Sequence, residues 1–515
     1  MRFRLTLRTW WSWGLLVALT LVCALGSSGR AEAAGAFNVF SVPDRGGFTG
    51  AYISLVLDVS GYPVVSYQEF GFDHDLRILH CNDPDCTGGD ETETEPDTTG
   101  DVGMWTSLAL DASGNPVVSY YDNTNGNLKV MHCNDPGCAG NDESITSPDT
   151  VGQVGYRTSL VLDAAGNPVI VHQDVTQYDF HVVHCNDPDC AGSDESITSP
   201  DPAGQSSPAS RRAIALDMAG NPIIAYQDFS INQDLKVMHC DDPNCAGGNE
   251  SITSPDTPGY SGDGASIVLD GSGNPIIAHH DTLTSDLRVV HCNDPDCSGG
   301  DESITAPDTD HLTGASPYVV LNSAGNPVIA YEGKLPTRPV WDLRVLTCND
   351  PDCAGGDDTI GMHEISGGNH QIQLDDTDSP IMAFTSFGMA VLHCWDELCS
   401  PDVDADNCAD TREQWNFYSG LEYNGGFRNP KDPHDYFNPT GDGQNRVDDV
   451  LAVVDAYYKD DTDGNPGLPP YAPGYNPDTD RTLTGPQAWR TGPPNGLQRI
   501  DDVLYQLSQY SHDCA

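Results

Sequence analysis

One unit of sequence recurs seven times up to residue 399, and this repetition constrains the fold more than any other feature. One copy reads TSLALDASGNPVVSYYDNTNGNLKVMHCNDPGCAGNDESITSPDT, from Thr106 to Thr150. A period of this length is typical of solenoids, arrays and propellers. The leucine before the first turn of the unit recurs every 52 to 54 residues, at Leu57, Leu110, Leu162, Leu216, Leu269, Leu321 and Leu374.

Each unit carries the pattern of four short strands. Runs such as SLALD, PVVSYY, NLKVMHC and ESITS alternate or are apolar, and turn residues bound each of them. The D-x-x-G-N-P link is a tight turn, because glycine supplies a positive φ and proline begins the next strand where no ladder donor is needed. Four antiparallel strands make one blade, so the sequence predicts an all-β, seven-bladed β-propeller.

The two ends of the array complement each other. Residues 37–43 resemble the fourth strand of a unit, yet they precede the first unit, and the seventh unit stops at Cys399 without that strand. We therefore expect the N-terminal strand to complete the last blade and close the ring, which removes its free edges. The propeller is predicted to span residues 34–399. Its units resemble those of secreted bacterial propeller-repeat proteins with L-D-x-x-G-N-P turns, which implies the blade fold and a binding role.

The N-terminus has the pattern of an export signal. A basic segment at residues 2–8 precedes an apolar run over residues 14–26, and a small-residue A-E-A motif ends at Ala33. We expect residues 1–33 to be a signal peptide and the mature chain to be secreted, either free or associated with a cell surface. No later stretch reaches about 18 consecutive apolar residues, so the sequence predicts no membrane span.

Cysteine usage fits an exported chain. Cys23 leaves with the signal, and an even number of cysteines then remains, which indicates disulfides. Zinc is the alternative, but it usually needs four ligands at one site, and isolated pairs about 50 residues apart do not supply them. The predicted disulfides are Cys81–Cys86, Cys133–Cys138, Cys185–Cys190, Cys240–Cys245, Cys292–Cys297, Cys348–Cys353, Cys394–Cys399 and Cys408–Cys514.

The chain is strongly acidic, with a formal net charge of −54. Such a balance excludes ordinary nucleic-acid binding, because no basic footprint exists. It is compatible with bound cations, and equally with a solvated surface that repels other copies.

The face of the propeller that holds the second-to-third-strand and fourth-to-first-strand loops varies between units, whereas the opposite face is nearly invariant. Positions that differ between the repeats can give each unit its own role, so we expect a ligand to bind on the varied face. Aromatic rings beside carboxylates suit a glycan or a peptide of an extracellular protein, although the tyrosines could instead pack only between blades. The candidate ligand-binding residues are Trp105, Tyr121, Asp122, Tyr156, Arg157, Asp174, Arg211, Asp228, His280 and Asp281.

Nothing in the repeats identifies an enzyme. A basic residue occupies one slot of the third strand in several units, and a histidine precedes the first cysteine in six of the seven. Residues copied from blade to blade are expected to be structural, and no set of non-repeated acids gathers in one blade. The sequence therefore favours a non-catalytic binding or adhesion protein, with a carbohydrate-active hydrolase or lyase of polysaccharide catabolism as the alternative.

Residues 400–415 form an acidic linker. Asp402, Asp404, Asp406 and Asp410 lie at alternate positions or nearly so, as carboxylates do in calcium loops. The run resembles thrombospondin type 3-like calcium linkers, which implies that these four aspartates bind calcium (Ca2+). An acidic hinge without metal is the alternative.

Residues 416–515 contain an internal duplication. The segment DGQNRVDDVL at 442–451 matches NGLQRIDDVL at 495–504, and each copy leads into an amphipathic helical pattern. The pair resembles a dockerin, a duplicated calcium-binding loop-helix module that docks onto a cohesin partner. The resemblance implies a small, mainly α domain with calcium at Asp442 and Asp449. The second loop departs from the dockerin pattern at its first positions, where it has Thr491 and Pro493.

Overall fold

The computed structural model describes residues 39–394, apart from gaps at 45–48, 72, 141, 203–205, 209–212, 229–232, 258, 311, 335–340, 364–368 and 387, together with two short strands near the C-terminus. Residues 1–37 form one unit, outside the described residues, and residues 38–515 form another. The predicted signal peptide (1–33) and acidic linker (400–415) also lie outside the described residues. Within 416–515 the description covers only β30 (Thr482–Leu483) and β31 (Thr491–Gly492), which pair with each other.

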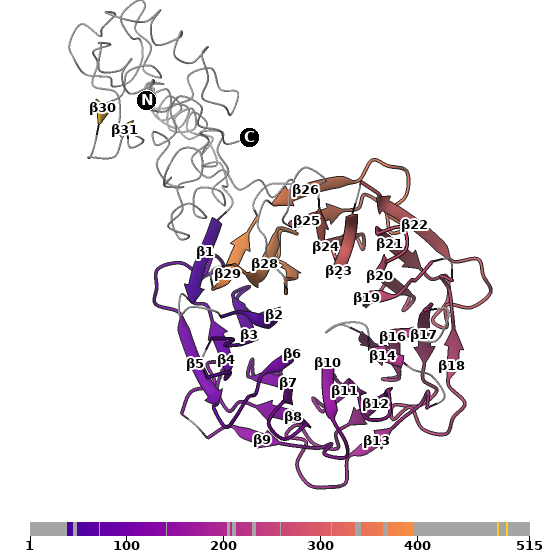
Figure 1. Ribbon diagram of the computed structural model, residues 1–515, viewed down its shortest axis with the longest axis horizontal. Coiled ribbons are helices and arrows are strands. Elements are labelled where there is room, and N and C mark those ends of the chain that lie inside the picture. Colours follow the sequence, from indigo (N-terminus) through magenta and orange to yellow (C-terminus); the bar gives the residue numbers. More distant parts are fainter. Residues whose placement is uncertain are drawn as a thin grey trace, which may run out of the picture. The chain divides into compact units, whose positions relative to one another are not determined.

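Seven antiparallel sheets surround a central axis, with the first strand of each unit innermost and the last outermost (Figure 1). This arrangement confirms the predicted seven-bladed β-propeller. Blade 1 contains β2 (Ala51–Leu57), β3 (Pro63–Gln68), β4 (Leu76–His80) and β5 (Thr92–Asp97). Blade 2 contains β6 (Met104–Leu110), β7 (Pro116–Asp122), β8 (Asn127–His132) and β9 (Ser144–Thr146). Blade 3 contains β10 (Val154–Leu162), β11 (Pro168–Asp174), β12 (Asp179–His184) and β13 (Ser196–Thr198).

The innermost strand of blade 4 is interrupted. Blade 4 contains β14 (Ser206–Pro208) and β15 (Ile214–Leu216), which both pair with β16 (Pro222–Asp228), followed by β17 (Leu235–His239) and β18 (Ser251–Thr253). Blade 5 contains β19 (Asp263–Leu269), β20 (Pro275–Asp281), β21 (Asp286–His291) and β22 (Ser303–Asp308). Blade 6 contains β23 (Leu312–Leu321), β24 (Pro327–Lys334), β25 (Asp342–Thr347) and β26 (Thr359–His363).

The N-terminal strand closes the ring, as the sequence predicted. Blade 7 contains β27 (Gln371–Leu374), β28 (Pro380–Thr385) and β29 (Met389–His393), and its outermost strand is β1 (Val39–Asp44). Val39 lies opposite His393 and Ser41 lies opposite Val391 in an antiparallel pairing. Closure gives the last blade its fourth strand and leaves no unpaired edge between the first and last units.

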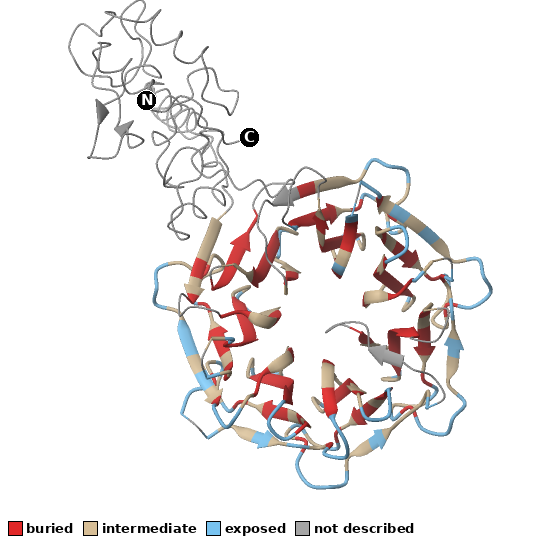
Figure 2. Ribbon diagram, viewed as in Figure 1, coloured by how far each residue is buried: buried red, intermediate tan, exposed pale blue. Residues whose placement is uncertain are grey.

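The core lies between blades. The second strand of each blade is buried along almost its whole length, and burial falls toward the outermost strands (Figure 2). One cluster joins Val64 and Ile78 of blade 1 to Val118 and Met131 of blade 2. Because each sheet packs on a neighbour at both faces, its middle strands read as continuous apolar runs. By contrast, Ile145 on β9 is exposed.

A buried polar clamp joins several of the blades to the next. Asp97, at the end of β5, accepts hydrogen bonds from the Tyr120 hydroxyl (2.7 Å) and the Lys129 ammonium (2.8 Å) of blade 2. The recurring basic slot is therefore structural, because it neutralises a buried carboxylate. The same clamp joins Asp44 with Tyr67 and Arg77, Asp201 with Tyr226 and Lys236, and Asp308 with Tyr331 and Arg344.

Between blades 6 and 7 all three members of the clamp are replaced together. No aspartate occurs between residues 359 and 370, at the end of blade 6. In blade 7 the tyrosine position holds Phe384 and the basic position holds Ala390, both buried. A hydroxyl or an ammonium buried there would lack the aspartate that is its partner in the blades with the clamp, and burying a polar group unpaired would cost free energy.

The repeated histidines form a second connection between blades. His132 lies 3.2 Å from Asp111 in the first turn of its own blade and 2.8 Å from Asp189 in the disulfide loop of the next. Corresponding bridges run from His239 and His291 to acidic residues of both blades. The unit with Thr347 in place of histidine has Asn322 in place of the turn aspartate, so these residues too change together.

Six of the predicted disulfides lie within the described residues, each inside its own blade. They are Cys81–Cys86, Cys133–Cys138, Cys185–Cys190, Cys240–Cys245, Cys292–Cys297 and Cys348–Cys353. Cys394 is also disulfide-bonded. Its predicted partner Cys399 and the predicted pair Cys408–Cys514 lie outside the described residues.

Candidate functional site

The innermost strands carry a β-bulge at the mouth of the central channel. The residue five positions before the repeat leucine has a positive φ in each described blade, although it is glycine only once. The pairing register shifts at the same place, for example between Met104 and Ser107. Left-handed backbone at a non-glycine residue costs energy and concentrates at functional sites. The bulge residues are Tyr52, Trp105, Arg157, Gly264, Ser316 and Asn369.

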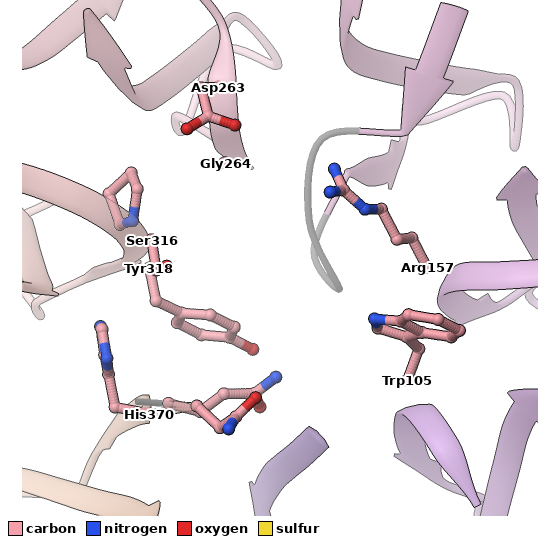
Figure 3. A pocket seen from close by; sticks show the side chains of 10 residues that line it. Trp105, Arg157, Asp263, Gly264, Ser316, Tyr318 and His370 are labelled. Carbon is pink, nitrogen blue, oxygen red and sulfur yellow. The ribbon is translucent and has the colours of Figure 1, made fainter. Parts of the chain in front are cut away.

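Five of these bulge residues line one axial pocket with a volume of about 230 Å³. The pocket lies at the start of the innermost strands and so on the varied face of the propeller (Figure 3). In Figure 3, Trp105 and Arg157 project from one side and Tyr318 and His370 from the other. The lining residues are Trp105, Arg157, Asp263, Gly264, Ser316, Pro317, Tyr318, Asn369, His370 and Gln371.

An aromatic cluster extends from the pocket across blades 1 to 3. The Trp105 ring centroid lies 4.4 Å from that of Tyr156 and 5.1 Å from that of Tyr52. Tyr121 packs behind them, 4.2 Å from Tyr156, and is buried. Burial, together with a hydrogen bond to Tyr156, raises the pKa of Tyr121, so the Tyr121 phenol stays neutral at physiological pH. The cluster offers a rigid apolar wall with hydroxyl groups at its edge.

Charged groups face this wall. Asp263 lies 3.6 Å from His280, and its interaction with that imidazole, aided by the field of Arg157, lowers the pKa of Asp263. Asp263 is therefore an ionised acceptor. Arg157 makes no ion pair within the described residues, whereas Arg77, Arg288 and Arg344 all do. In a chain of net charge −54, an arginine without an ion pair at a pocket is available to a ligand.

His370 contributes an unsatisfied polar group. Its side chain is buried, and neither ring nitrogen has a hydrogen-bond partner among the described residues. The nearest carboxylate oxygen is Glu332 Oε1, 3.8 Å from Nδ1. Buried polar groups normally find partners, so an imidazole without one at a pocket wall marks a place where a ligand or water would bind.

The structure gathers some of the predicted ligand-binding residues and separates others. Trp105 and Arg157 line the pocket, Tyr121 and Tyr156 support Trp105, and His280 holds Asp263. Arg211 has the corresponding place in the sequence of its repeat, five residues before Leu216, but it lies outside the described residues. The pocket does not include the four predicted aspartates, which are buried one to a blade at the hairpin after the second strand: Asp122, Asp174, Asp228 and Asp281.

Eight of the ten lining residues were not among the predicted ligand-binding residues, although the repeat held a signal for some of them. Aligning the units on their leucine would have placed Ser316 and Asn369 beside Trp105 and Arg157 as members of one ring. The residues adjacent to the ring, Asp263 and His370, carry no such mark. The predicted calcium ligands, Asp402 to Asp410, Asp442 and Asp449, lie outside the described residues.

No family model and no curated protein match the chain. Among solved structures, an ulvan lyase from a new family of polysaccharide lyases is 13% identical, with a TM-score of 0.45 over 67% of this chain and 94% of the other. The NanB sialidase from Streptococcus pneumoniae is 12% identical, with a TM-score of 0.38 over 68% and 69%. The BP39L lectin from Burkholderia pseudomallei is 10% identical, with a TM-score of 0.39 over 66% and 97%. Likenesses this distant carry no argument about what this chain binds.

The described residues contain no helix that is long and apolar enough to cross a membrane.

Proposed function

We propose that this chain is a secreted binding protein that holds a terminal sugar of a glycan in the axial pocket. The observation that carries the proposal is the aromatic wall of Trp105 and Tyr156 beside Arg157, which makes no ion pair within the described residues. Trp105 and Arg157 are bulge residues that line the axial pocket. Sugar rings present apolar faces that stack on aromatic side chains and hydroxyl groups that need donors and acceptors. Arg157 is a donor and Asp263 is an acceptor on opposite sides of one space.

The size of the pocket limits the ligand. Sites for drug-sized molecules have volumes of about 300–1,000 Å³, and this one is smaller, at about 230 Å³. It would accommodate one sugar residue, while the rest of the glycan extends over the loops of the varied face. An extracellular protein that carries such a glycan would be recognised in the same way.

The pocket favours binding over hydrolysis. A glycosidase needs two carboxyl groups on either side of the scissile bond, and Asp263 is the only carboxylate among the described lining residues. One observation supports the alternative of a polysaccharide lyase, because His370 and Tyr318 could exchange protons with a substrate near Arg157. Unsaturated products released from a uronate-containing polysaccharide would establish that alternative.

The experiment is a glycan array probed with the full-length protein, followed by calorimetry on the glycans that bind. Trp105→Ala should weaken binding by about 2 kcal/mol, roughly 30-fold in Kd, as truncation of a central aromatic residue does. Met218→Ala is the matched control, because Met218 is fully exposed in a turn on the opposite face. Unchanged affinity in the Trp105 variant would remove the pocket from the proposal.

The C-terminal region is proposed to tether the propeller. Its dockerin-like duplication and its acidic run would bind calcium, and a cohesin-like partner would then hold the chain at a surface. The propeller disulfides and the N-terminal signal pattern support export.

A further inference from the structure

Blade 3 departs from the inter-blade clamp of its neighbours. The carboxylate of Asp149 there receives two histidines instead of a tyrosine and a lysine or arginine. His181, in the basic slot, has Nδ1 2.7 Å from Asp149 Oδ2, and His172, in the tyrosine position, has Nε2 3.4 Å from the same oxygen. Asp174 and Asp179 approach from the hairpin that joins β11 to β12.

The hydrogen bonds fix the role of each imidazole. The Gly155 N–H donates to His172 Nδ1 at 3.0 Å, so the proton of neutral His172 is on Nε2, the nitrogen that lies 3.4 Å from Asp149. A carboxylate only accepts, so His181 donates to Asp149 from Nδ1. The remaining nitrogen of His181, Nε2, then carries a lone pair when the ring is neutral. A metal-binding histidine typically has this arrangement, with its other N–H held by a carboxylate.

The lone pair of His181 faces two carboxylates. Nε2 lies 3.9 Å from Asp174 Oδ2, and potential ligand atoms of His181, Asp174 and Asp179 all lie within 4.8 Å of one another. Asp179 is only 7% exposed, and its Oδ1 has no hydrogen-bond partner among the residues that the structure describes, while Oδ2 accepts from the Ser199 hydroxyl at 2.6 Å. Burying a carboxylate oxygen without a hydrogen-bond partner costs free energy, unless a cation binds to it.

Blade 5 shows what is missing from blade 3. The same five positions there hold Asp256, His279, Asp281, Asp286 and Arg288. The Gly262 N–H donates to His279 Nδ1 as in blade 3. The Arg288 guanidinium lies 2.6 Å from Asp256 and 3.7 Å from Asp281, which supplies a permanent positive charge. Blade 3 also has three carboxylates at the corresponding positions, but the titratable imidazole of His181 takes the place of the arginine.

We propose that blade 3 holds a divalent transition-metal ion, ligated by His181 Nε2, Asp174 and Asp179. Asp149 orients the histidine, and water completes the coordination. One imidazole with two carboxylates suits zinc or manganese, whereas calcium takes six to eight oxygen ligands. Metal–ligand distances of about 2.0–2.2 Å in tetrahedral geometry require the widest separations between ligand atoms to shorten by up to about 1.4 Å on binding. The ion would fix the blade 3 hairpin on the same face as the axial pocket.

The electrostatic field of the site agrees with this assignment. Burial alone would lower the pKa of His181, but its bond to Asp149 and the charges of Asp179 and Asp174 outweigh burial and raise that pKa. The carboxylates that favour a proton on this ring would favour a divalent cation more strongly, because the attraction scales with charge.

The test uses the full-length protein, stripped of metal and titrated with Zn2+ at pH 7.5, with Co2+ absorption as a second measurement. The variant His181→Arg copies blade 5, so it keeps the clamp neutralised and the fold intact. We expect it to bind one Zn2+ fewer than the wild type and to lose the Co2+ bands of an imidazole-ligated site. Asp179→Asn should weaken the same site at least tenfold. Ca2+ at equal concentration should not compete.

The reciprocal variant makes the proposal sharper. Arg288→His in blade 5 should add one Zn2+ equivalent, because it recreates the blade 3 set of groups. Equal Zn2+ stoichiometry in wild type and His181→Arg would overturn the proposal, as would Co2+ bands that persist in that variant. Absence of Zn2+ binding in the wild type would show that a protonated His181 serves as the cation instead.

Discussion

The inter-blade clamp at Asp308 can be tested by leaving its arginine without a partner. Asp308 accepts from the Tyr331 hydroxyl at 2.6 Å and from Arg344 at 2.7 Å, and both charged residues are almost fully buried. Asp308→Asn removes the negative charge but keeps an oxygen that can accept from the Asp310 N–H. Breaking a buried ion pair from one side costs about 3–5 kcal/mol, because the other charge stays buried and uncompensated. We expect a loss of that size.

The compensating variant follows the composition of blade 7, where Phe384 and Ala390 occupy these positions. Asp308→Asn combined with Tyr331→Phe and Arg344→Met replaces the buried polar set with side chains of similar volume. Such replacements are often neutral, so at least half of the lost stability should return. The measurement is urea unfolding of the full-length protein, with unfolding free energies compared at matched slopes. A single variant within about 1 kcal/mol of wild type, or a triple variant no better than the single one, would refute the reasoning.

Three further outcomes are expected. Deletion of β1 should expose the edge of β29, lower the melting temperature of the protein and cause association that increases with concentration, as measured by light scattering. A variant that stays monomeric with an unchanged melting temperature would contradict the closure of the ring by β1. Burial alone would raise the pKa of Asp111 and Asp217, but backbone amides and the repeat histidines outweigh it and lower that pKa. Their stabilisation is therefore full above their unfolded pKa of 3.8 and lost as pH falls through the lower folded value, so acid melts should be flat down to about pH 4; a loss of stability that begins well above pH 4 would contradict this. Chelation of calcium should increase hydrogen exchange in residues 400–515 and leave residues 39–394 protected, and identical exchange would make the acidic run a linker without metal.

The sequence by itself determined the architecture of this protein. The sequence predicted a closed ring of seven blades from the period of the repeat, from its strand pattern, and from the extra N-terminal strand that the last unit lacks. These features can be recognised in the sequence because turn chemistry and strand periodicity act locally, within each unit. The C-x4-C spacing predicted the six disulfides that the structure describes, since cysteines so close together can pair without help from the fold. The structural role of the repeated basic residues also followed from their repetition.

Only the tertiary structure decided which individual residues meet. Asp263, Tyr318 and His370 come from three different blades, and closure of the ring brings them to one pocket with Trp105. The predicted aspartates are buried at their own hairpins, where the basic position of the third strand lies beside them, as Lys129 lies 3.5 Å from Asp122. A repeat in the sequence shows which residues the blades have in common, but the axial pocket is lined mainly by residues that differ from blade to blade. Contacts between residues about 50 to 260 positions apart depend on the geometry of the closed ring, which no local pattern encodes.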